Sequence, residues 1–367
     1  MKVCSWNIAR SLNEKLTNTD FVNNLKSFDI VFLTECWCKD IDTEVNIEGF
    51  CEPIILCRKK MRGGGIVLFF KEWLKNYICV EKTCADTYMW IKLDKLATGY
   101  CTDVFLCLCY LPPENTRYYE CYDVDLFEMI ENDMMAYKSR GKIMILGDLN
   151  SRIGLRNEQI ENDRLNDELH QKLNSVIEYV TDDNLFTHHR FSMDTHVNTF
   201  GRKLLELCKT AQMLILNGRH SGDEGGKFTF FSSRGMSVND YCIVSNSMWS
   251  LVNSFRVGDF NEFSDHAPLV AELQRLNEKD IGVVEEKKAQ VHYICRWNEN
   301  NIDDIKKSLL DNYSDLRELV SNIDDQSSES INSGVHEFLR ILNKITEKCQ
   351  HKVLIKNPLN AHYRTKD

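Results

Sequence analysis

The sequence has no hydrophobic run long enough to cross a membrane, and its first 20 residues lack the pattern of a secretory signal. Apolar segments typical of strands begin almost at once, so we expect an intracellular protein of the nucleus or cytoplasm with no membrane partner. Positive charge is also scarce: 45 Lys and Arg stand against 55 Asp and Glu, for a formal net charge of −10. A protein with that balance that binds a polyanion must confine its basic residues to one face.

A zinc-finger spacing is also missing, although the sequence contains 15 cysteines. Cys36 and Cys38 are too close together for a usual zinc finger, and no matching pair follows at ligand spacing. Others, such as Cys107 and Cys109, lie inside apolar runs, where a thiol packs as a small hydrophobe. Because a secretory signal is missing as well, this usage favours reduced thiols over a disulfide framework.

The chain divides into two parts of different character. Residues 1–275 alternate apolar runs with amphipathic or polar segments, which is typical of a layered α/β fold. Residues 276–367 begin with a charged linker and continue with two helical patterns, 302–320 and 335–349. We therefore predict one large domain over 1–275, followed by a linker and helical tail over 276–367.

Local patterns inside the first part predict further elements. Helices are expected from Thr19 onward and over 116–138 and 203–211, and the polar stretch 152–174 predicts a surface excursion. The apolar runs 228–231 and 241–244 flank Arg234 and predict a β-hairpin.

Polar residues stand at the boundaries of several apolar runs that predict buried strands. The set comprises Asn7 after 3–6, Glu35 after 30–34, Asp148 and Asn150 after 143–146, Asp240 before 241–244, and Asp265 and His266 before 267–270. Because strand ends meet at the edge of a sheet, we expect folding to bring these side chains together.

These residue types suit metal-assisted attack on a phosphodiester. That reaction needs an aligned water, neutralised charge on the phosphate and protection of the leaving oxygen. Glu35 is a suitable oxygen ligand for Mg²⁺, and Asp148 can deprotonate a water with Asn150 beside it. His266, paired with a carboxylate such as Asp240, can hold a proton on the phosphate.

Each short motif is weak evidence when taken alone. Gly147-Asp148-Leu149-Asn150 is commonly a turn after a strand, and Ser264-Asp265-His266 is commonly a loop or a helix cap. Asp240 also fits a turn in a hairpin. The joint occurrence of these motifs, each at the boundary of an apolar run, favours the functional interpretation.

This ordered set resembles the endonuclease/exonuclease/phosphatase superfamily of DNase I-like enzymes. The resemblance covers residues 1–275 and rests on Trp6-Asn7-Ile8, Leu33-Thr34-Glu35, Tyr110-Leu111-Pro112-Pro113, Gly147-Asp148-Leu149-Asn150, Ser237-Val238-Asn239-Asp240-Tyr241 and Ser264-Asp265-His266. It implies a four-layer α/β sandwich, in which two packed, mainly antiparallel sheets are flanked by helices.

The resemblance also implies roles for individual residues. It implies a catalytic set of Asn7, Tyr110, Asp148, Asn150, Asp240 and His266, and a site for Mg²⁺, with Mn²⁺ as a substitute, at Glu35, Asn7 and Asp265. Substrate contacts are expected at Thr229, Arg234 and Ser264, with a second basic cluster at 58–62. Ala9 departs from family nucleases that carry an acidic residue there, so a single-ion site is expected.

Within the superfamily, the sequence is most similar to endonuclease domains of non-LTR retrotransposons. The similarity lies in residues 198–208, 215–219 and 226–230. It implies a Mg²⁺-dependent DNA nickase that leaves 3′-hydroxyl and 5′-phosphate ends.

Two other functions stay open on sequence grounds. A phosphatase or phospholipid phosphodiesterase would share the fold, although residues 237–241 lack the Trp-Cys-Asp-Arg sequence of inositol phosphatases. A catalytically silent binding module would also keep the fold, although such copies should lose their catalytic residues first.

Overall fold

The structure, a computed structural model, describes residues 1–37, 45–57, 63–84, 87–158, 190–276, 302–322 and 328–346. The basic cluster 58–62, most of the polar stretch 152–174 and the linker after residue 276 lie outside the described residues. The chain forms two compact units, residues 1–287 and 288–367, and each is described by itself. The domain boundary expected at 275 stays a prediction.

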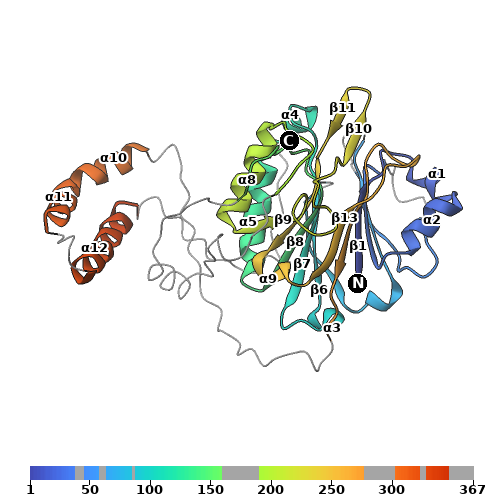
Figure 1. The fold of residues 1–367 in the computed structure, drawn as a ribbon, viewed down its shortest axis with the longest axis horizontal. Helices are drawn as coiled ribbons and strands as arrows, with labels where there is room; N and C mark the ends of the chain where they lie inside the picture. The colour runs from blue at the N-terminus through green and yellow to red at the C-terminus, as the bar shows by residue number, and fades with distance from the viewer. Residues whose placement is uncertain are drawn as a thin grey trace. The chain divides into compact units, whose positions relative to one another are not determined.

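The first unit contains two six-stranded sheets (Figure 1). The first sheet has the strand order β13-β14-β1-β2-β4-β3. Its strands are β1 (Lys2–Asn7), β2 (Ile30–Thr34), β3 (Ile54–Leu56), β4 (Ile66–Phe70), β13 (Val252–Val257) and β14 (Leu269–Leu273). Only the β1–β2 pair is parallel, and the other pairs of this sheet are antiparallel.

The second sheet has the strand order β5-β6-β7-β8-β12-β9. Its strands are β5 (Ile78–Cys84), β6 (Tyr88–Leu93), β7 (Asp103–Tyr110), β8 (Gly141–Asp148), β9 (Met213–Ile215) and β12 (Asp240–Ser245). The β7–β8 pair is parallel and the remaining pairs are antiparallel. Each sheet therefore has one parallel pair near its centre, and both members of that pair end at the same edge.

Helices cover the outer faces of the sheets. On the first sheet, α2 (Thr19–Lys26) begins where the Asn18 side chain accepts hydrogen bonds from two backbone amides, and it buries Phe21 and Leu25. On the second sheet, α5 (Leu126–Lys138) and α8 (Thr199–Thr210) begin at the capping residues Asp125 and Asn198. The shorter elements are α1 (Leu12–Leu16), η1 (Glu72–Leu74), α3 (Lys95–Thr98), α4 (Arg117–Cys121) and α9 (Asn246–Trp249).

Three apolar clusters hold these layers together. The central cluster packs the two sheets against each other and contains buried side chains from both, such as Phe32 and Leu106. The outer two lie between each sheet and its helices, and contain Trp6 and Phe21 on one side and Trp90 and Ile130 on the other. The predicted α/β sandwich, with two mainly antiparallel sheets flanked by helices, is confirmed.

The predicted hairpin pairs different strands from those expected. β10 (Phe230–Ser232) pairs with β11 (Gly235–Ser237), whereas β12 lies between β8 and β9 in the second sheet. The reason is burial, because every residue of β12 is buried while most of β10 and β11 is not. The helix expected over 116–138 is also interrupted, since α5 starts anew at its own cap, Asp125.

The described part of the second unit is helical, as expected for the tail. It comprises α10 (Ile302–Asp311), α11 (Tyr313–Asn322) and α12 (Ser328–Thr346). The continuous helix expected over 302–320 is divided at Asn312, and α12 starts earlier than the predicted 335. None of the helices that the structure describes has the length and apolar character needed to cross a bilayer.

Candidate active site

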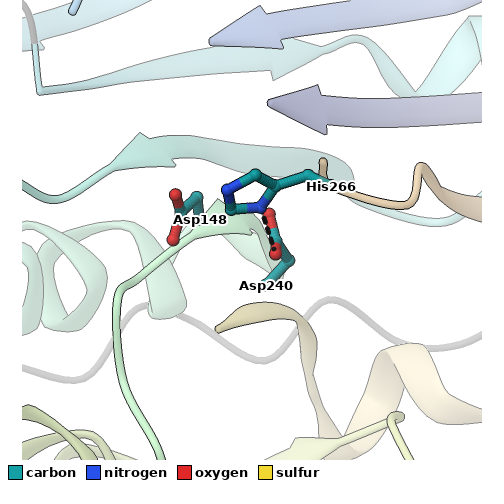
Figure 2. Close-up of side chains that lie close together, drawn as sticks. All are labelled: Asp148, Asp240 and His266. Carbon is teal, nitrogen blue, oxygen red and sulfur yellow. Dashed lines mark hydrogen bonds and ion pairs between the residues drawn. The ribbon is translucent and has the colours of Figure 1, made fainter. Parts of the chain in front are cut away.

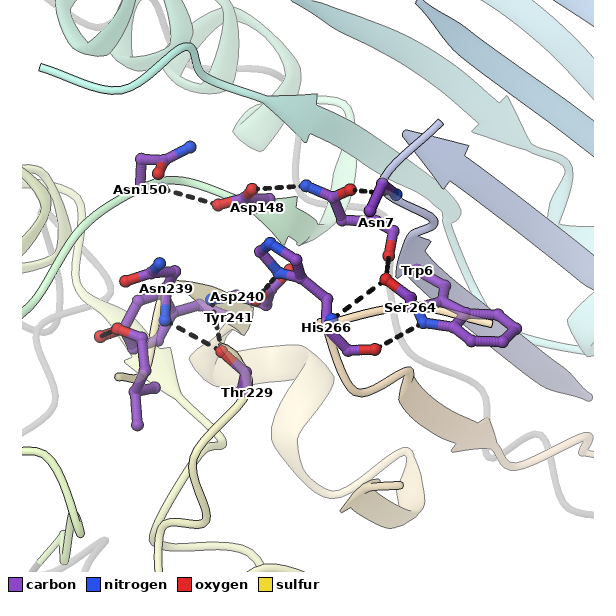
Figure 3. Close-up of polar contacts among 12 residues, drawn as sticks. Trp6, Asn7, Asp148, Asn150, Thr229, Asn239, Asp240, Tyr241, Ser264 and His266 are labelled. Atoms are coloured by element: carbon purple, nitrogen blue, oxygen red, sulfur yellow. Dashed lines mark hydrogen bonds and ion pairs between the residues drawn. The ribbon is translucent and has the colours of Figure 1, made fainter. Parts of the chain in front are cut away.

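Asp148 lies at the end of β8, between the strands that carry two other predicted residues. In the register of the sheet it is opposite Tyr110 of β7 on one side and Asp240 of β12 on the other. Its two carboxylate oxygens accept one hydrogen bond each, from the Asn7 Nδ2 amide at 2.9 Å and from the Asn150 backbone amide at 2.9 Å (Figure 3). The carboxylate is thereby fixed in orientation although it is only 2% exposed.

The residue before Asp148 sets how closely β7 and β8 approach. Gly147 has a φ of 142°, and a Cβ at this position would lie 1.9 Å from the backbone oxygen of Cys109 in β7. No side chain fits at that distance. A glycine is therefore required immediately before the carboxylate, in addition to any turn preference of the motif.

His266 and Asp240 form a buried pair beside Asp148 (Figure 2). The His266 Nδ1 lies 2.9 Å from Asp240 Oδ2, and both residues are almost fully buried. Ligand atoms of the three residues lie within 4.8 Å of one another. Three titratable groups thus share one small volume, where each controls the protonation of the others.

Burial and charge change the protonation of this cluster. Burial, with the neighbouring charge of Asp240, raises the pKa of Asp148 to about 7. For His266, burial alone would lower the pKa, but the charge and hydrogen bond of Asp240 and the charge of Asp148 raise it to about 9. Near neutral pH the cluster therefore pairs a carboxylate that can take up a proton with an imidazolium that can donate one.

Residues from the first sheet hold His266 against this cluster. The Trp6 indole Nε1 donates a 2.8 Å hydrogen bond to the backbone oxygen of His266. The Ser264 hydroxyl donates to the Asn7 backbone oxygen at 2.6 Å and accepts from the His266 amide at 3.0 Å. The predicted residue Ser264 thus joins the end of β1 to His266.

Glu35 follows β2 in a left-handed conformation, with a φ of 54°. The Tyr110 hydroxyl donates to one of its carboxylate oxygens, and the Trp37 indole and the Gly64 amide donate to the other. Tyr110 was predicted as a catalytic residue, and here its hydroxyl orients Glu35. Such support from neighbouring donors is typical of carboxylates that bind metals.

An open hollow of about 280 Å³ lies beside the buried cluster. Its lining includes Asn7, Glu35 and Asp265, the three predicted Mg²⁺ ligands, as well as His266. The side-chain oxygens of these three residues are the donor type that Mg²⁺ prefers, and a half-open site leaves room for the waters that the ion keeps. The residues present therefore fit a magnesium ion.

The cluster of Asp148, Asp240 and His266 is a second group that could hold a cation. We favour the hollow for Mg²⁺ for two reasons. The Nδ1 of His266 is already bonded to Asp240, and imidazole suits zinc or copper better than magnesium. The raised pKa of Asp148 also suits proton transfer.

The remaining predicted residues differ in how accessible they are. Arg234 is exposed in the β10–β11 turn, where it can reach a partner. Thr229 is fully buried, and its hydroxyl accepts hydrogen bonds from the amides of Asn239 and Asp240, so it supports β12 rather than facing a substrate. The Asn150 side-chain amide donates to the Leu111 backbone oxygen, so it is the backbone of Asn150 that orients Asp148.

Asn198 was not singled out as a site residue, yet it supports the loop after Asp148. Its Oδ1 accepts from the amides of Arg152 and of Gly201, which caps α8, and its Nδ2 donates to the Asn150 backbone oxygen at 2.9 Å. Its position before a helix would have identified the cap, but the contact with Asn150 joins positions 48 residues apart.

Comparisons with known proteins agree with this fold. The chain is 12% identical to an AP endonuclease, LMAP, from Leishmania major, covering 75% of this chain and 88% of that one with a TM-score of 0.53. It also matches a 3′-5′ exonuclease, NExo, from Neisseria meningitidis at 16% identity, covering 75% of this chain and 100% of that one with a TM-score of 0.49. A structure of the 3′ phosphatase NExo from Neisseria bound to product DNA hairpin matches at 16% identity, covering 75% and 99% with a TM-score of 0.48. A search of curated proteins gave no match.

The sequence itself matches a known family along most of its length. Residues 4–266 match the Endonuclease/Exonuclease/phosphatase family, a range that includes Asn7, Glu35, Asp148, Asp240 and His266. Members of this family are usually hydrolytic nucleases or phosphatases, and they commonly use divalent metal ions. The chain therefore belongs to the Endonuclease/Exonuclease/phosphatase family.

Proposed function

We propose that this protein is a Mg²⁺-dependent DNA endonuclease that nicks one strand and leaves 3′-hydroxyl and 5′-phosphate ends. The observation that carries the proposal is Asp148, whose buried carboxylate is held by Asn7 and Asn150 next to the His266–Asp240 pair. The hollow that adjoins them is lined by Glu35 and is large enough for a phosphate group.

The proposed reaction divides the proton transfers between the two buried groups. Ionised Asp148 takes a proton from the attacking water, which becomes the nucleophile on phosphorus. His266, kept protonated by Asp240, donates a hydrogen bond to a phosphate oxygen and stabilises the charge that develops there. A magnesium ion held by Glu35, Asn7 and Asp265 supplies charge neutralisation at the phosphate and leaving oxygen.

DNA is the proposed substrate, and a non-LTR retrotransposon endonuclease is the proposed type. Support for the type comes from the sequence similarity over 198–208, 215–219 and 226–230. Support for DNA also comes from Arg234, which stands exposed on a hairpin that touches the site: Phe230 of β10 forms an isolated bridge with His266. An exposed arginine in that place can contact a phosphate or enter a groove.

Nicking of supercoiled plasmid tests the proposal. The wild-type protein with Mg²⁺ should convert supercoiled plasmid to the open circular form, and both EDTA and Asp148→Asn should prevent the conversion. DNA ligase should reseal the product, because ligation requires a 3′-hydroxyl and a 5′-phosphate.

Other outcomes of the same assay separate the alternative functions. A wild-type protein that binds duplex DNA but does not cut it would support a silent binding module. Release of inorganic phosphate from a 3′-phosphorylated oligonucleotide or an inositol phosphate, without nicking, would support a phosphatase.

A further inference from the structure

Three consecutive residues after β1 adopt the left-handed backbone conformation. The φ angles are 48° at Ala9, 89° at Arg10 and 59° at Ser11, and none of the three is a glycine. Side chains disfavour this region, and residues held there cluster at ligand-binding and catalytic positions. The segment therefore needs contacts that hold it, and a reason for its shape.

The contacts come from Lys15 and from the two ligand-bearing strands. The Lys15 ammonium donates to the backbone oxygens of Ile8 and Arg10, on both sides of the turn. The Arg10 amide donates to the Glu35 backbone oxygen at 2.7 Å, and the Ala9 amide donates to Asn7 Oδ1 at 3.0 Å. The segment is thus tied directly to two of the proposed magnesium ligands.

This shape brings Arg10 to the wall of the hollow, together with Glu35 and Asp265. Among the described residues that line it, Arg10 alone carries a permanent positive charge. Although two carboxylates line the same hollow, no ion pair between Arg10 and either of them is present in the described part of the chain. The guanidinium is exposed, so its donors can reach a ligand in solution.

We propose that Arg10 binds a phosphate of the substrate strand next to the one that is cleaved, and that Lys15 is a positioning residue for it. The inference rests on the proposed function, because it names a group that anchors the same substrate. A guanidinium matches two phosphate oxygens with parallel hydrogen bonds, and such contacts fix the strand without reading its sequence. In a chain with a net charge of −10, a cation at this point also offsets the repulsion of a polyanion.

Salt-dependent DNA binding tests the inference separately from cleavage. Binding of a labelled duplex is measured by fluorescence anisotropy in EDTA, so that no strand is cut, over a range of salt concentrations. Arg10→Gln should weaken binding about tenfold and reduce the slope of log K against log salt by about 1. Arg10→Lys should restore the slope but only part of the affinity, because an ammonium lacks the planar fork.

Two further variants identify the role of the loop. Lys15→Met should weaken binding, and adding it to Arg10→Gln should cost little more, because both changes remove one interaction. Arg140→Gln is the matched control, since Arg140 stands before the start of β8, whose opposite end carries Asp148, and it pairs with Glu81. The control should leave the slope unchanged, and thermal melting should show that every variant is folded.

The results distinguish the inference from the proposed function. If Arg10→Gln keeps the wild-type slope while the wild-type protein nicks plasmid, the inference is wrong and the proposed function stands. If the wild-type protein neither binds duplex DNA nor nicks it, both are wrong.

Discussion

The two sides of the candidate site differ in their access to water. On one side, Asp148, Asp240 and His266 are at most 6% exposed and bond to one another or to protein amides. On the other side, Glu35 is half-buried and Asp265 and Arg10 are exposed around an open hollow. The buried side has perturbed pKa values suited to moving protons, whereas the open side leaves carboxylate oxygens accessible to a hydrated cation. We therefore expect substitutions on the two sides to give different defects.

Asp148→Asn should give the largest effect. Loss of the buried carboxylate removes the proposed base, so the rate of nicking should fall by about 10³-fold or more, with little change in the affinity for duplex DNA. The melting temperature should not fall, because burial already disfavours the charged form of Asp148. A variant with more than a tenth of the wild-type rate would remove Asp148 from the mechanism.

The pH dependence should separate the two groups of the buried side. Nicking should rise with pH through about 7 as Asp148 loses its proton, and should fall through about 9 as His266 loses its own. Asp240→Asn removes the charge that raises the pKa of His266, so it should move the alkaline limb to lower pH and reduce the rate by about 10²-fold.

The same substitution should change the pH dependence of stability. The pKa of His266 is raised from 6.5 to about 9 in the folded protein, so its contribution is complete below pH 6.5 and is lost as the pH rises to about 9. The difference in unfolding free energy between the wild type and Asp240→Asn should therefore shrink over that window, as measured by urea denaturation. A constant difference across the window would contradict the assigned protonation of His266.

Glu35→Gln probes the open side, where the defect should be in metal use. The magnesium concentration for half-maximal nicking should rise by roughly 10- to 100-fold, while the position of the pH limbs stays unchanged at saturating magnesium. Magnesium should also raise the melting temperature of the wild type more than that of Glu35→Gln. Equal magnesium requirements in the two proteins would place the metal elsewhere.

Asn198→Asp should give the smallest effect. An aspartate keeps the oxygen that caps α8 but loses the Nδ2 donor to the Asn150 backbone oxygen, so kcat should fall about tenfold with KM and melting temperature nearly unchanged. Asn18→Asp, at the cap of α2, is the matched control and should have no effect on kcat. Equal kinetics for the two variants would show that Asn198 acts only as a cap.

The buried side of the site was largely predictable from the sequence. The apolar runs before Asn7, Glu35 and Asp148 form β1, β2 and β8, because continuous burial on both faces gives a continuous hydrophobic run. The pairing of Asp240 with His266 was also expected, since a carboxylate beside an imidazole has a chemical reason to be there.

The supporting contacts and the strand pairing were harder to predict. Strand β12 was expected in a hairpin, but its partner depends on which edge of the sheet is free, and this is set by distant strands. The left-handed turn at Ala9 and Arg10 has no glycine to signal it, because Lys15 stabilises it from outside the segment. Short strands such as β3 and β13 are only partly buried, so their pattern is weak.

The close approach of β7 and β8 at Gly147 has a consequence for the evolution of this site. Any side chain at this position would force the central strands of the second sheet apart, and Tyr110 and Asp148 lie opposite each other at the next register position. The orientation of Glu35 by Tyr110 and the location of Asp148 would then change together. A single methyl group, far smaller than any loop insertion, would disconnect the metal-binding carboxylate from the water-activating one, so tolerance to substitution should reach its minimum at a residue that performs no chemistry.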